Sequence, residues 1–221
     1  MEAPLLASLI LACAMAGTWD TPADPAGSDT ANTADTADTG ANENVSGSGD
    51  VGARAPRAGE LVITEIMDDP DPTDDDAGEW FEVRNLSGVS LALNGLTLSD
   101  ADGEQIRFDT DLVVGPDGLL VIAASDDTAA NGGIVPDLVF DTSDFHLGNT
   151  SDEIVLAMGT ETLDEVAYDD RFPHEKGRSR ALDPLGTSAT RNDEPAYWCE
   201  GEEPYGTEEN RGTPGAPNGA C

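Results

Sequence analysis

The densest group of residues that could do chemistry in this sequence is an acidic run between residues 68 and 76. The run places six carboxylates in nine residues and is followed by Glu79. A hard divalent cation, which takes about six to eight oxygen ligands, would relieve the repulsion among them. Prolines and a threonine stand where an EF-hand needs ligands and its turn glycine, so the run does not match that motif. We predict a candidate calcium site, with a solvated acidic loop as the alternative, at Asp68, Asp69, Asp71, Asp74, Asp75 and Asp76.

Residue patterns for catalysis are sparse. The two histidines, His146 and His174, do not stand in a metal-binding spacing such as H-E-x-x-H, and the sequence has no G-x-S-x-G element or phosphate-binding loop. We therefore expect no enzyme activity and assign no catalytic residue. The segment from Asp100 to Glu104 is interpreted as hairpin chemistry in preference to a metal site. Tyr197 and Trp198 are expected in packing, with an exposed platform for a sugar or peptide as the alternative.

The first of the three cysteines lies directly after an apolar run. Pro4 to Ala12 is too short to span a bilayer as a mature helix and is typical of an export signal. The segment Ile10-Leu11-Ala12-Cys13 resembles the lipobox of bacterial lipoproteins, which implies cleavage before Cys13 and acylation of its thiol. Ala14-Met15-Ala16 also fits an ordinary secretory cleavage site, so simple secretion is the alternative.

The other two cysteines, Cys199 and Cys221, form an even pair near the C-terminus. An exported chain meets an oxidising compartment, in which such a pair is expected to form a disulfide. Closing a loop of about twenty residues would stabilise the fold by roughly 3 kcal/mol in the chain-entropy model. Two free thiols are the alternative.

A low-complexity segment separates the apolar run from the rest of the chain. A Thr-Ala-Asp pattern recurs every three residues between Thr30 and Thr39, and no lysine or arginine precedes Arg54. Such a segment can neither bury a core nor collapse onto itself. We predict a signal peptide at residues 1–12 and a disordered acidic linker at residues 13–58. As a flexible coil, this linker would span on the order of 40 Å.

The charge balance restricts the choice of partner. Forty-five acidic residues against ten basic ones give a formal net charge of −35. This charge repels the phosphate backbone of nucleic acids and anionic lipid headgroups, and it attracts cations. We therefore expect no nucleic-acid partner, and we expect contact with a membrane through the lipid anchor only.

From residue 59 onward, short runs of β-branched and aliphatic residues alternate with turn residues. Asp102-Gly103, Pro116-Asp117-Gly118 and Gly159-Thr160 supply turn chemistry between them. The pattern predicts an all-β fold, an immunoglobulin-like β-sandwich at residues 59–172, followed by a C-terminal extension at residues 173–221. The predicted strands are Leu61 to Met67, Trp80 to Val83, Leu96 to Leu98, Gln105 to Phe108, Leu119 to Ala124, Asp137 to Phe140, Glu153 to Met158 and Leu163 to Tyr168.

Several of these segments resemble the lamin-tail domain, an immunoglobulin-like module of nuclear lamins that also occurs in bacterial surface and secreted proteins. Leu61 to Ile66 resembles its opening strand, and Glu79 to Asn85 resembles its E-W-I-E-L-Y-N segment. Leu93 to Asp100 resembles its L-x-G-W-x-L-x-D segment, with Leu96 where the family often has tryptophan. Further similarities follow at Gly115 to Gly118 and Leu147 to Glu153, and a loose one follows at Gly177 to Leu182. Thr213 to Asn218 closely resembles the T-P-G-x-x-N terminus of the family. The resemblance implies an immunoglobulin-like sandwich, here of a bacterial exported lipoprotein type.

The resemblance also bears on function. Lamin tails associate with DNA and chromatin, but this acidic chain lacks the basic patch that such binding needs, so that activity is not carried over. We expect a non-catalytic module at the cell envelope that serves as a surface binding or structural domain for a protein or glycan. Ala14 after Cys13 favours the outer membrane, and secretion is the alternative location. Two other functions stay open: an accessory module of an extracellular nuclease or phosphatase system, and a calcium-dependent adhesion module.

Overall fold

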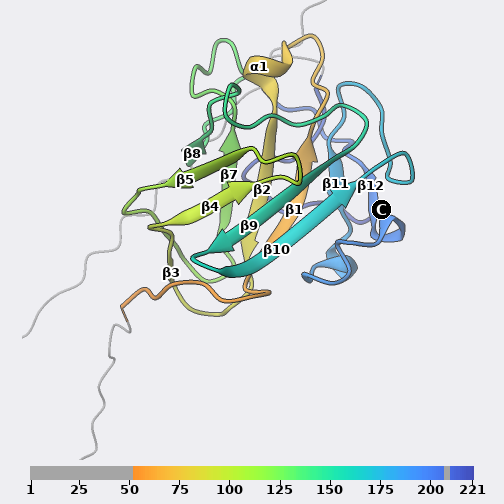
Figure 1. Cartoon of the computed structure of the whole chain (residues 1–221). Coiled ribbons are helices and arrows are strands. Elements are labelled where there is room, and N and C mark those ends of the chain that lie inside the picture. The colour runs from red at the N-terminus through yellow and green to blue at the C-terminus, as the bar shows by residue number, and fades with distance from the viewer. Residues whose placement is uncertain (1–51, 207–209) are drawn as a thin grey trace, which may run out of the picture. The chain divides into compact units, whose positions relative to one another are not determined.

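Two main β-sheets face each other across an apolar core in the computed structural model, which describes residues 52–206 and 210–221 (Figure 1). The larger sheet has six strands in the order β12-β11-β1-β2-β7-β8. Only β7 and β8 run parallel among its neighbours, and the other pairs are antiparallel. In that order the strands are β12 (Trp198–Glu200), β11 (Arg180–Leu182), β1 (Leu61–Met67), β2 (Trp80–Asn85), β7 (Leu119–Ala123) and β8 (Leu138–Val139).

The smaller main sheet has four strands in the order β10-β9-β4-β5, and a separate pair joins β3 to β6. These strands are β10 (Glu161–Tyr168), β9 (Asp152–Met158), β4 (Leu96–Ser99), β5 (Gln105–Phe108), β3 (Leu91–Ala92) and β6 (Val113–Val114). Helical structure within the described ranges comprises α1 (Asp75–Gly78) and two 3-10 turns, η1 (Pro184–Gly186) and η2 (Pro195–Tyr197). Across those ranges, every helix falls short of the length and apolarity needed to cross a membrane.

Burial explains why β1 lies in the middle of the larger sheet. All seven of its residues are buried, and its LVITEIM sequence is apolar at five of them. One face of the strand points to the core, and C-terminal residues cover the other. β9 and β10 instead alternate between buried and more exposed residues, because one face of their sheet meets solvent. The fully buried sequence of β1 therefore marks a strand covered on both faces, and the alternating sequences of β9 and β10 mark a sheet with one face in solvent.

Short turns set the register of the hairpins in the smaller sheet. Gly159-Thr160 joins β9 to β10 as a two-residue turn, and Gly159 has a φ of 64°, which glycine adopts without strain. The loop between β4 and β5 is longer than the two-residue turn that Asp102-Gly103 predicts, and it runs from residue 100 to residue 104. Asp100 organises this loop by accepting hydrogen bonds from the N–H groups of Gly103 and Glu104, each at 2.8 Å.

All eight predicted segments contain a strand, and the predicted all-β, immunoglobulin-like sandwich is confirmed. The four strands that were not predicted, β3, β6, β11 and β12, have two or three residues each, too few to show an alternating pattern. β11 and β12 come from the segment predicted as a C-terminal extension. Because they extend the larger sheet beside β1, residues after 173 are part of the sandwich.

The sandwich also begins before residue 59, where the linker was predicted to end. The N–H of Arg54 donates to the carbonyl of Ser90 at 3.3 Å, and its own carbonyl accepts from the N–H of Ala92 at 2.8 Å. Its guanidinium pairs with Glu60 at 2.7 Å. Arg54 is the first basic residue of the chain, so it is the first that can neutralise an acidic side chain. The predicted signal peptide and the linker up to residue 51 lie outside the described residues.

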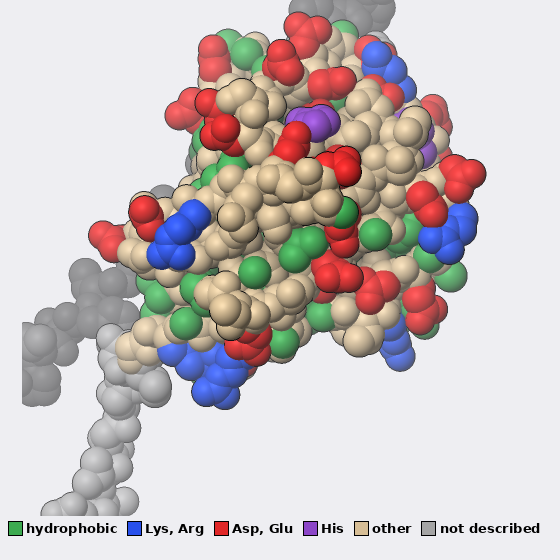
Figure 2. Space-filling view, viewed as in Figure 1, with side chains coloured by type: hydrophobic (Ala, Val, Ile, Leu, Met, Phe, Trp, Pro, Cys, Tyr) green, Lys and Arg blue, Asp and Glu red, His purple; other side chains and the backbone are tan. Residues whose placement is uncertain are grey.

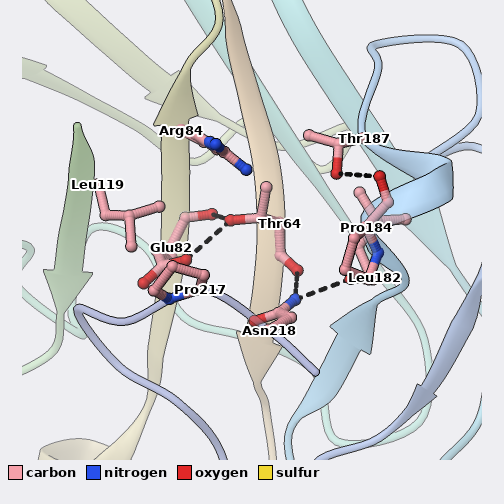
Figure 3. Close-up of a pocket in the computed structure, with 9 residues that line it drawn as sticks. All are labelled: Thr64, Glu82, Arg84, Leu119, Leu182, Pro184, Thr187, Pro217 and Asn218. Atoms are coloured by element: carbon pink, nitrogen blue, oxygen red, sulfur yellow. Dashed lines mark hydrogen bonds between the residues drawn. The ribbon is translucent and has the colours of Figure 1, made fainter. Parts of the chain in front are cut away.

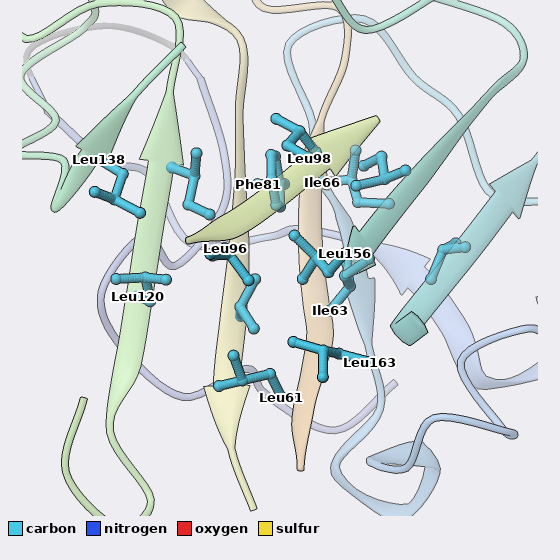
Figure 4. Close-up of a cluster of buried hydrophobic side chains, with 14 of the residues drawn as sticks. Leu61, Ile63, Ile66, Phe81, Leu96, Leu98, Leu120, Leu138, Leu156 and Leu163 are labelled. Atoms are coloured by element: carbon cyan, nitrogen blue, oxygen red, sulfur yellow. The ribbon is translucent and has the colours of Figure 1, made fainter. Parts of the chain in front are cut away.

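Aliphatic side chains from both sheets close the core (Figure 4). Leu96 and Leu98 of β4 lie over Ile63, Ile66 and Phe81 of the larger sheet, and all five side chains are fully buried. Burying one such side chain contributes about 1.5–3 kcal/mol. Leu96 therefore keeps the core apolar at the position where the lamin-tail pattern often has tryptophan.

Shortening one of these leucines tests the packing. We expect Leu98→Ala to lower the free energy of unfolding by about 2–5 kcal/mol, because it removes buried methyl groups and leaves a cavity. Leu185→Ala, at a side chain with 78% exposure, serves as the control and should change stability by less than about 0.5 kcal/mol. Urea denaturation measures both, and equal effects of the two substitutions would contradict this core.

Candidate functional site

Two buried glutamates lie on the outer face of the larger sheet, where a segment from the C-terminus covers them. Glu65 of β1 and Glu82 of β2 have exposed fractions of 0% and 1%. The covering segment, residues 210–221, is called the strap. Thr213 donates to Glu65 through its N–H at 2.9 Å and its hydroxyl at 2.8 Å, and the N–H of Gly215 donates to Glu82 at 2.9 Å. Side-chain carboxyl groups thus hold the strap against the sheet.

Two further contacts fix the end of the strap. The side-chain amide of Asn218 donates to the carbonyls of Thr64 and Leu182, at 2.7 and 3.0 Å. Cys221 forms the predicted disulfide with Cys199 of β12, with a Cα–Cα distance of 5.6 Å. The segment that resembles the T-P-G-x-x-N terminus therefore has a structural role in closing the outer face of the sandwich.

Burial raises the pKa of several carboxyl groups in the sandwich. It raises the pKa of Glu82 to about 8, although this carboxyl accepts hydrogen bonds from Thr64 and Gly215. Burial likewise raises the pKa of Glu79 to about 8 and that of Asp164 to about 7. These groups therefore hold a proton over much of the neutral range, which lowers the charge that the fold must bury.

Beside the strap, the outer sheet face is hollowed into a pocket of about 80 Å³, which we call the sheet-face pocket (Figure 3). Strands β1, β2 and β7 form its base, and the strap and the η1 turn stand at its sides. The pocket is lined by Thr64, Glu82, Arg84, Leu119, Leu182, Pro184, Thr187, Pro217 and Asn218.

Most polar side chains of the sheet-face pocket are already used within the protein. The Thr64 hydroxyl lies 2.9 Å from a carboxyl oxygen of Glu82, and the Thr187 hydroxyl donates to a carbonyl of η1 at 3.1 Å. Arg84 is different. Its partner within the described ranges is the exposed Asp117, 3.3 Å from Nη2, and its buried Nε has none. The guanidinium is thus partly exposed at the edge of an apolar hollow, where its terminal nitrogens can donate further hydrogen bonds.

The first carboxylate of the predicted calcium site points into the protein. Asp68 is 1% exposed, and its two oxygens accept from Nε and Nη2 of Arg180 at 3.1 and 2.7 Å. Arg180 is itself fully buried, and its guanidinium lies 4.6 Å from the centre of the Tyr168 ring. Each side chain stabilises the charge of the other, because removing either would leave the other charge buried and unpaired. Asp68 is thus engaged in an ion pair.

The other members of the run are partly or fully exposed. Asp69 and Asp71 lie 3.9 and 3.6 Å from the Lys176 ammonium. In the described parts of the chain, no group of three or more His, Cys, Asp or Glu side chains is arranged to hold a metal ion. The calcium site stays a prediction. The remaining three predicted ligands lie at the start of α1: Asp74, Asp75 and Asp76.

The histidines and aromatic residues singled out in the sequence lie in separate places. His146 is 57% exposed and pairs with Glu104 at 2.8 Å, whereas His174 lies 3.7 Å from Asp69. Trp198 is 5% exposed, and its indole N–H donates to the carbonyl of Asn192 at 2.7 Å. Trp198 therefore packs in the core, as the first interpretation predicts, and does not present a binding platform.

A second buried polar pair, besides that of Asp68 with Arg180, was also not predicted. The side-chain amide of Asn192 donates to Asp164 at 2.7 Å, and the same carboxyl oxygen accepts from the N–H of Ile63 at 2.7 Å. This pair ties a C-terminal loop to β1 and β10. The sequence signal for this pair is Asp164 alone, an acidic residue at a buried position of the strand β10. Its partner Asn192 lies in a loop and belongs to no recognisable pattern.

The raised pKa values of Glu79, Glu82 and Asp164 predict a pH-dependent stability. Each of these carboxyl groups binds its proton more tightly in the folded than in the unfolded chain. Its contribution to the free energy of unfolding is therefore complete below its ordinary pKa, near 4, and is lost as the pH rises through its folded pKa. We expect the free energy of unfolding to fall between about pH 5 and pH 9, by at most about 1.4 kcal/mol per pH unit for each group. Urea denaturation across this range measures the slope.

Glu82→Gln should reduce the slope of the free energy of unfolding against pH. Its amide can donate to the Thr64 hydroxyl and still accept from Gly215, as a protonated Glu82 would, but it does not titrate. Asp102→Asn, in an exposed loop, is the matched control and should leave the slope unchanged. Equal slopes in the parent and in Glu82→Gln would contradict a neutral buried carboxyl at this position.

The disulfide should stabilise the sandwich by restricting the unfolded chain. The two cysteines are 22 residues apart, and a loop of this length corresponds to about 3 kcal/mol. We expect the double substitution Cys199→Ser and Cys221→Ser to lower the free energy of unfolding by about this amount. Reduction of the parent protein should reproduce the loss, and no change in either experiment would contradict the role of the strap.

Comparison with known sequences agrees with this architecture. The sequence model of the Lamin Tail Domain family matches residues 54–170, more than half of the 221 residues. A search among curated proteins finds no match. The matched span begins at Arg54, where the sandwich begins, and includes β1 through β10. The chain therefore belongs to the Lamin Tail Domain family.

Proposed function

We propose that this chain is an exported, non-catalytic module that is tethered to the cell envelope and binds or organises a protein partner outside the cytoplasm. The observation that carries the proposal is the strap. Its disulfide joins Cys199 to Cys221, and a cross-link of this kind persists in an oxidising compartment. The apolar run from Pro4 to Ala12 supports the same location, because it fits an export signal.

The absence of catalysis is supported by how the buried acidic groups are used. Glu65 and Glu82 hold the strap, Glu79 accepts from the N–H of Leu147 at 2.9 Å, and Asp68 is paired with Arg180. A general acid or base must reach the proton that it transfers. Carboxyl groups buried in structural contacts are poorly placed for this task, so we assign these groups to stability.

The charge of the surface favours a partner that is not a nucleic acid. Figure 2 shows acidic side chains over much of the visible face of the sandwich, with lysine and arginine in a few small groups near its margin. A surface of this sign repels phosphate backbones and remains soluble at high local concentration. We propose a protein partner with a neutral or basic contact surface.

The tether in this proposal is the N-terminal segment. Acylation of Cys13 would leave residues 14–53 between the lipid and the sandwich. An acidic chain of this composition would hold the sandwich on the order of 40 Å from the membrane. One acyl chain binds a membrane only weakly, so stable anchoring needs the additional acyl chains of a lipoprotein terminus. Simple secretion without an anchor is the alternative arrangement.

Expression of the full chain in a Gram-negative bacterial host tests the proposal. We expect labelled palmitate to be incorporated into the parent and not into Cys13→Ala, and mass spectrometry of the mature protein should find a lipid-modified N-terminus at residue 13. Cys13→Ala isolates the anchor, because it leaves the sandwich and its disulfide unchanged. An unlipidated N-terminus at Gly17 would replace the anchor with secretion, and an intact Met1 on a cytoplasmic protein would contradict export.

Assays on the same protein test the second half of the proposal. We expect no nuclease or phosphatase activity above that of Glu79→Gln, which removes a buried carboxyl with a raised pKa. Hydrolysis that the parent performs and this single substitution abolishes would contradict a non-catalytic role.

A further inference from the structure

We propose that the sheet-face pocket binds one small aliphatic or prolyl side chain of an extended, uncharged peptide segment, while Arg84 donates to a neighbouring peptide carbonyl. This inference rests on the proposed function, because it assigns the chemistry of the partner to a particular place on the module. It concerns the outer face of the larger sheet, beside the strap, and is separate from the acidic run near α1.

The walls of the sheet-face pocket select for an apolar group. Leu119, Leu182, Pro184 and Pro217 supply carbon surface from a strand, a second strand, a 3-10 turn and the strap. The cavity has a volume of about 80 Å³, roughly half of the ~150 Å³ cavity that accepts benzene. This space suits an isopropyl group or a pyrrolidine ring. A larger aromatic side chain would not fit without opening the strap.

The hydrogen-bonding groups of the pocket select for a single kind of polar partner. Glu82 is engaged by Thr64 and Gly215, so it offers little to a ligand. Arg84 offers more, because 31% of its side chain is exposed and its ion pair within the described ranges, with the 76% exposed Asp117, is long at 3.3 Å. An acceptor at the pocket mouth would give the terminal nitrogens of the guanidinium a further partner. A peptide carbonyl next to the inserted side chain provides such an acceptor.

Charge decides between a carbonyl and a carboxylate. Asp117 already balances part of the charge of Arg84, and the chain as a whole carries a formal net charge of −35. An anionic ligand would therefore meet net repulsion on approach. A sugar is also a poor match, because the lining has no aromatic side chain on which a sugar ring could stack. The chemistry that remains is a neutral peptide.

The pocket is formed before any ligand binds. Thr64, Glu82 and Leu119 lie on neighbouring strands of the larger sheet, and Asn218 fixes the strap through two backbone carbonyls. A site on rigid elements loses little conformational entropy when it binds. A short peptide can therefore bind without reorganising the sandwich, although so small a contact implies an affinity in the millimolar range.

Titration of the oxidised full-length chain with capped tripeptides tests the inference, with methyl NMR signals of Leu119 and Leu182 as the readout. The probes are acetyl-Ala-Val-Ala-amide, acetyl-Ala-Pro-Ala-amide, acetyl-Ala-Asp-Ala-amide and the disaccharide cellobiose. We expect saturable shifts with the valine or the proline peptide, and binding at least about tenfold weaker for the aspartate peptide and for cellobiose.

Three variants separate specific binding from surface adsorption. Arg84→Gln should weaken binding by about tenfold, the effect of one hydrogen bond to a charged donor, and Thr187→Phe should abolish binding by filling the mouth. Arg171→Gln is the matched control, because Arg171 is 70% exposed and pairs with the neighbouring Asp169 in a loop. Unchanged chemical shifts elsewhere in the sandwich would show that each variant is folded.

Several outcomes would overturn the inference. These are no saturable shift with either neutral peptide, preferred binding of cellobiose or the aspartate peptide, or binding that Arg84→Gln and Thr187→Phe leave intact. Such a failure would be distinguishable from failure of the proposed function, because export, lipid attachment and the absence of hydrolysis are measured independently of this pocket.

Discussion

The structure depends on the burial of strand β1 on both of its faces. The core-facing side of β1 packs against the smaller sheet through Ile63 and Ile66, and its other side carries Thr64 and Glu65. A polar side chain can stay buried there only if it is hydrogen-bonded, and the strap supplies the donors. The C-terminal segment is thus required to complete the sandwich, even though it lies outside the span that the family model matches.

The need to hydrogen-bond buried polar groups also explains the acidic residues of this protein. Their burial and raised pKa values resemble those of catalytic carboxyl groups, but their contacts are structural. A carboxyl group under the strap accepts from backbone N–H groups that no strand partner reaches, and its raised pKa follows from the burial that this position imposes. The ion pair of Asp68 with Arg180 joins the end of β1 to β11 in a similar way. What remains for recognition is the surface, where the partly exposed Arg84 makes a long ion pair of 3.3 Å with Asp117.

The sequence predicted the parts of the fold that are encoded locally. Runs of apolar residues located the longer strands, and Gly159 located a hairpin, because each of these signals is contained in a few consecutive residues. The partner of Asp68 could not be foreseen, since Arg180 is 112 residues away and only the folded chain brings the two together. The sheet-face pocket could not be foreseen for the same reason. Its lining comes from four strands, a 3-10 turn and the strap, none of which carries a binding pattern by itself.

The most direct test of this account is amide hydrogen exchange at the strap of the oxidised protein. The N–H groups of Thr213 and Gly215 donate to Glu65 and Glu82, so the account predicts that they exchange slowly, with protection comparable to that of the β1 amides. Exchange of both at the rate of a free peptide, while β1 stays protected, would show that the larger sheet is closed without the strap and would contradict the account.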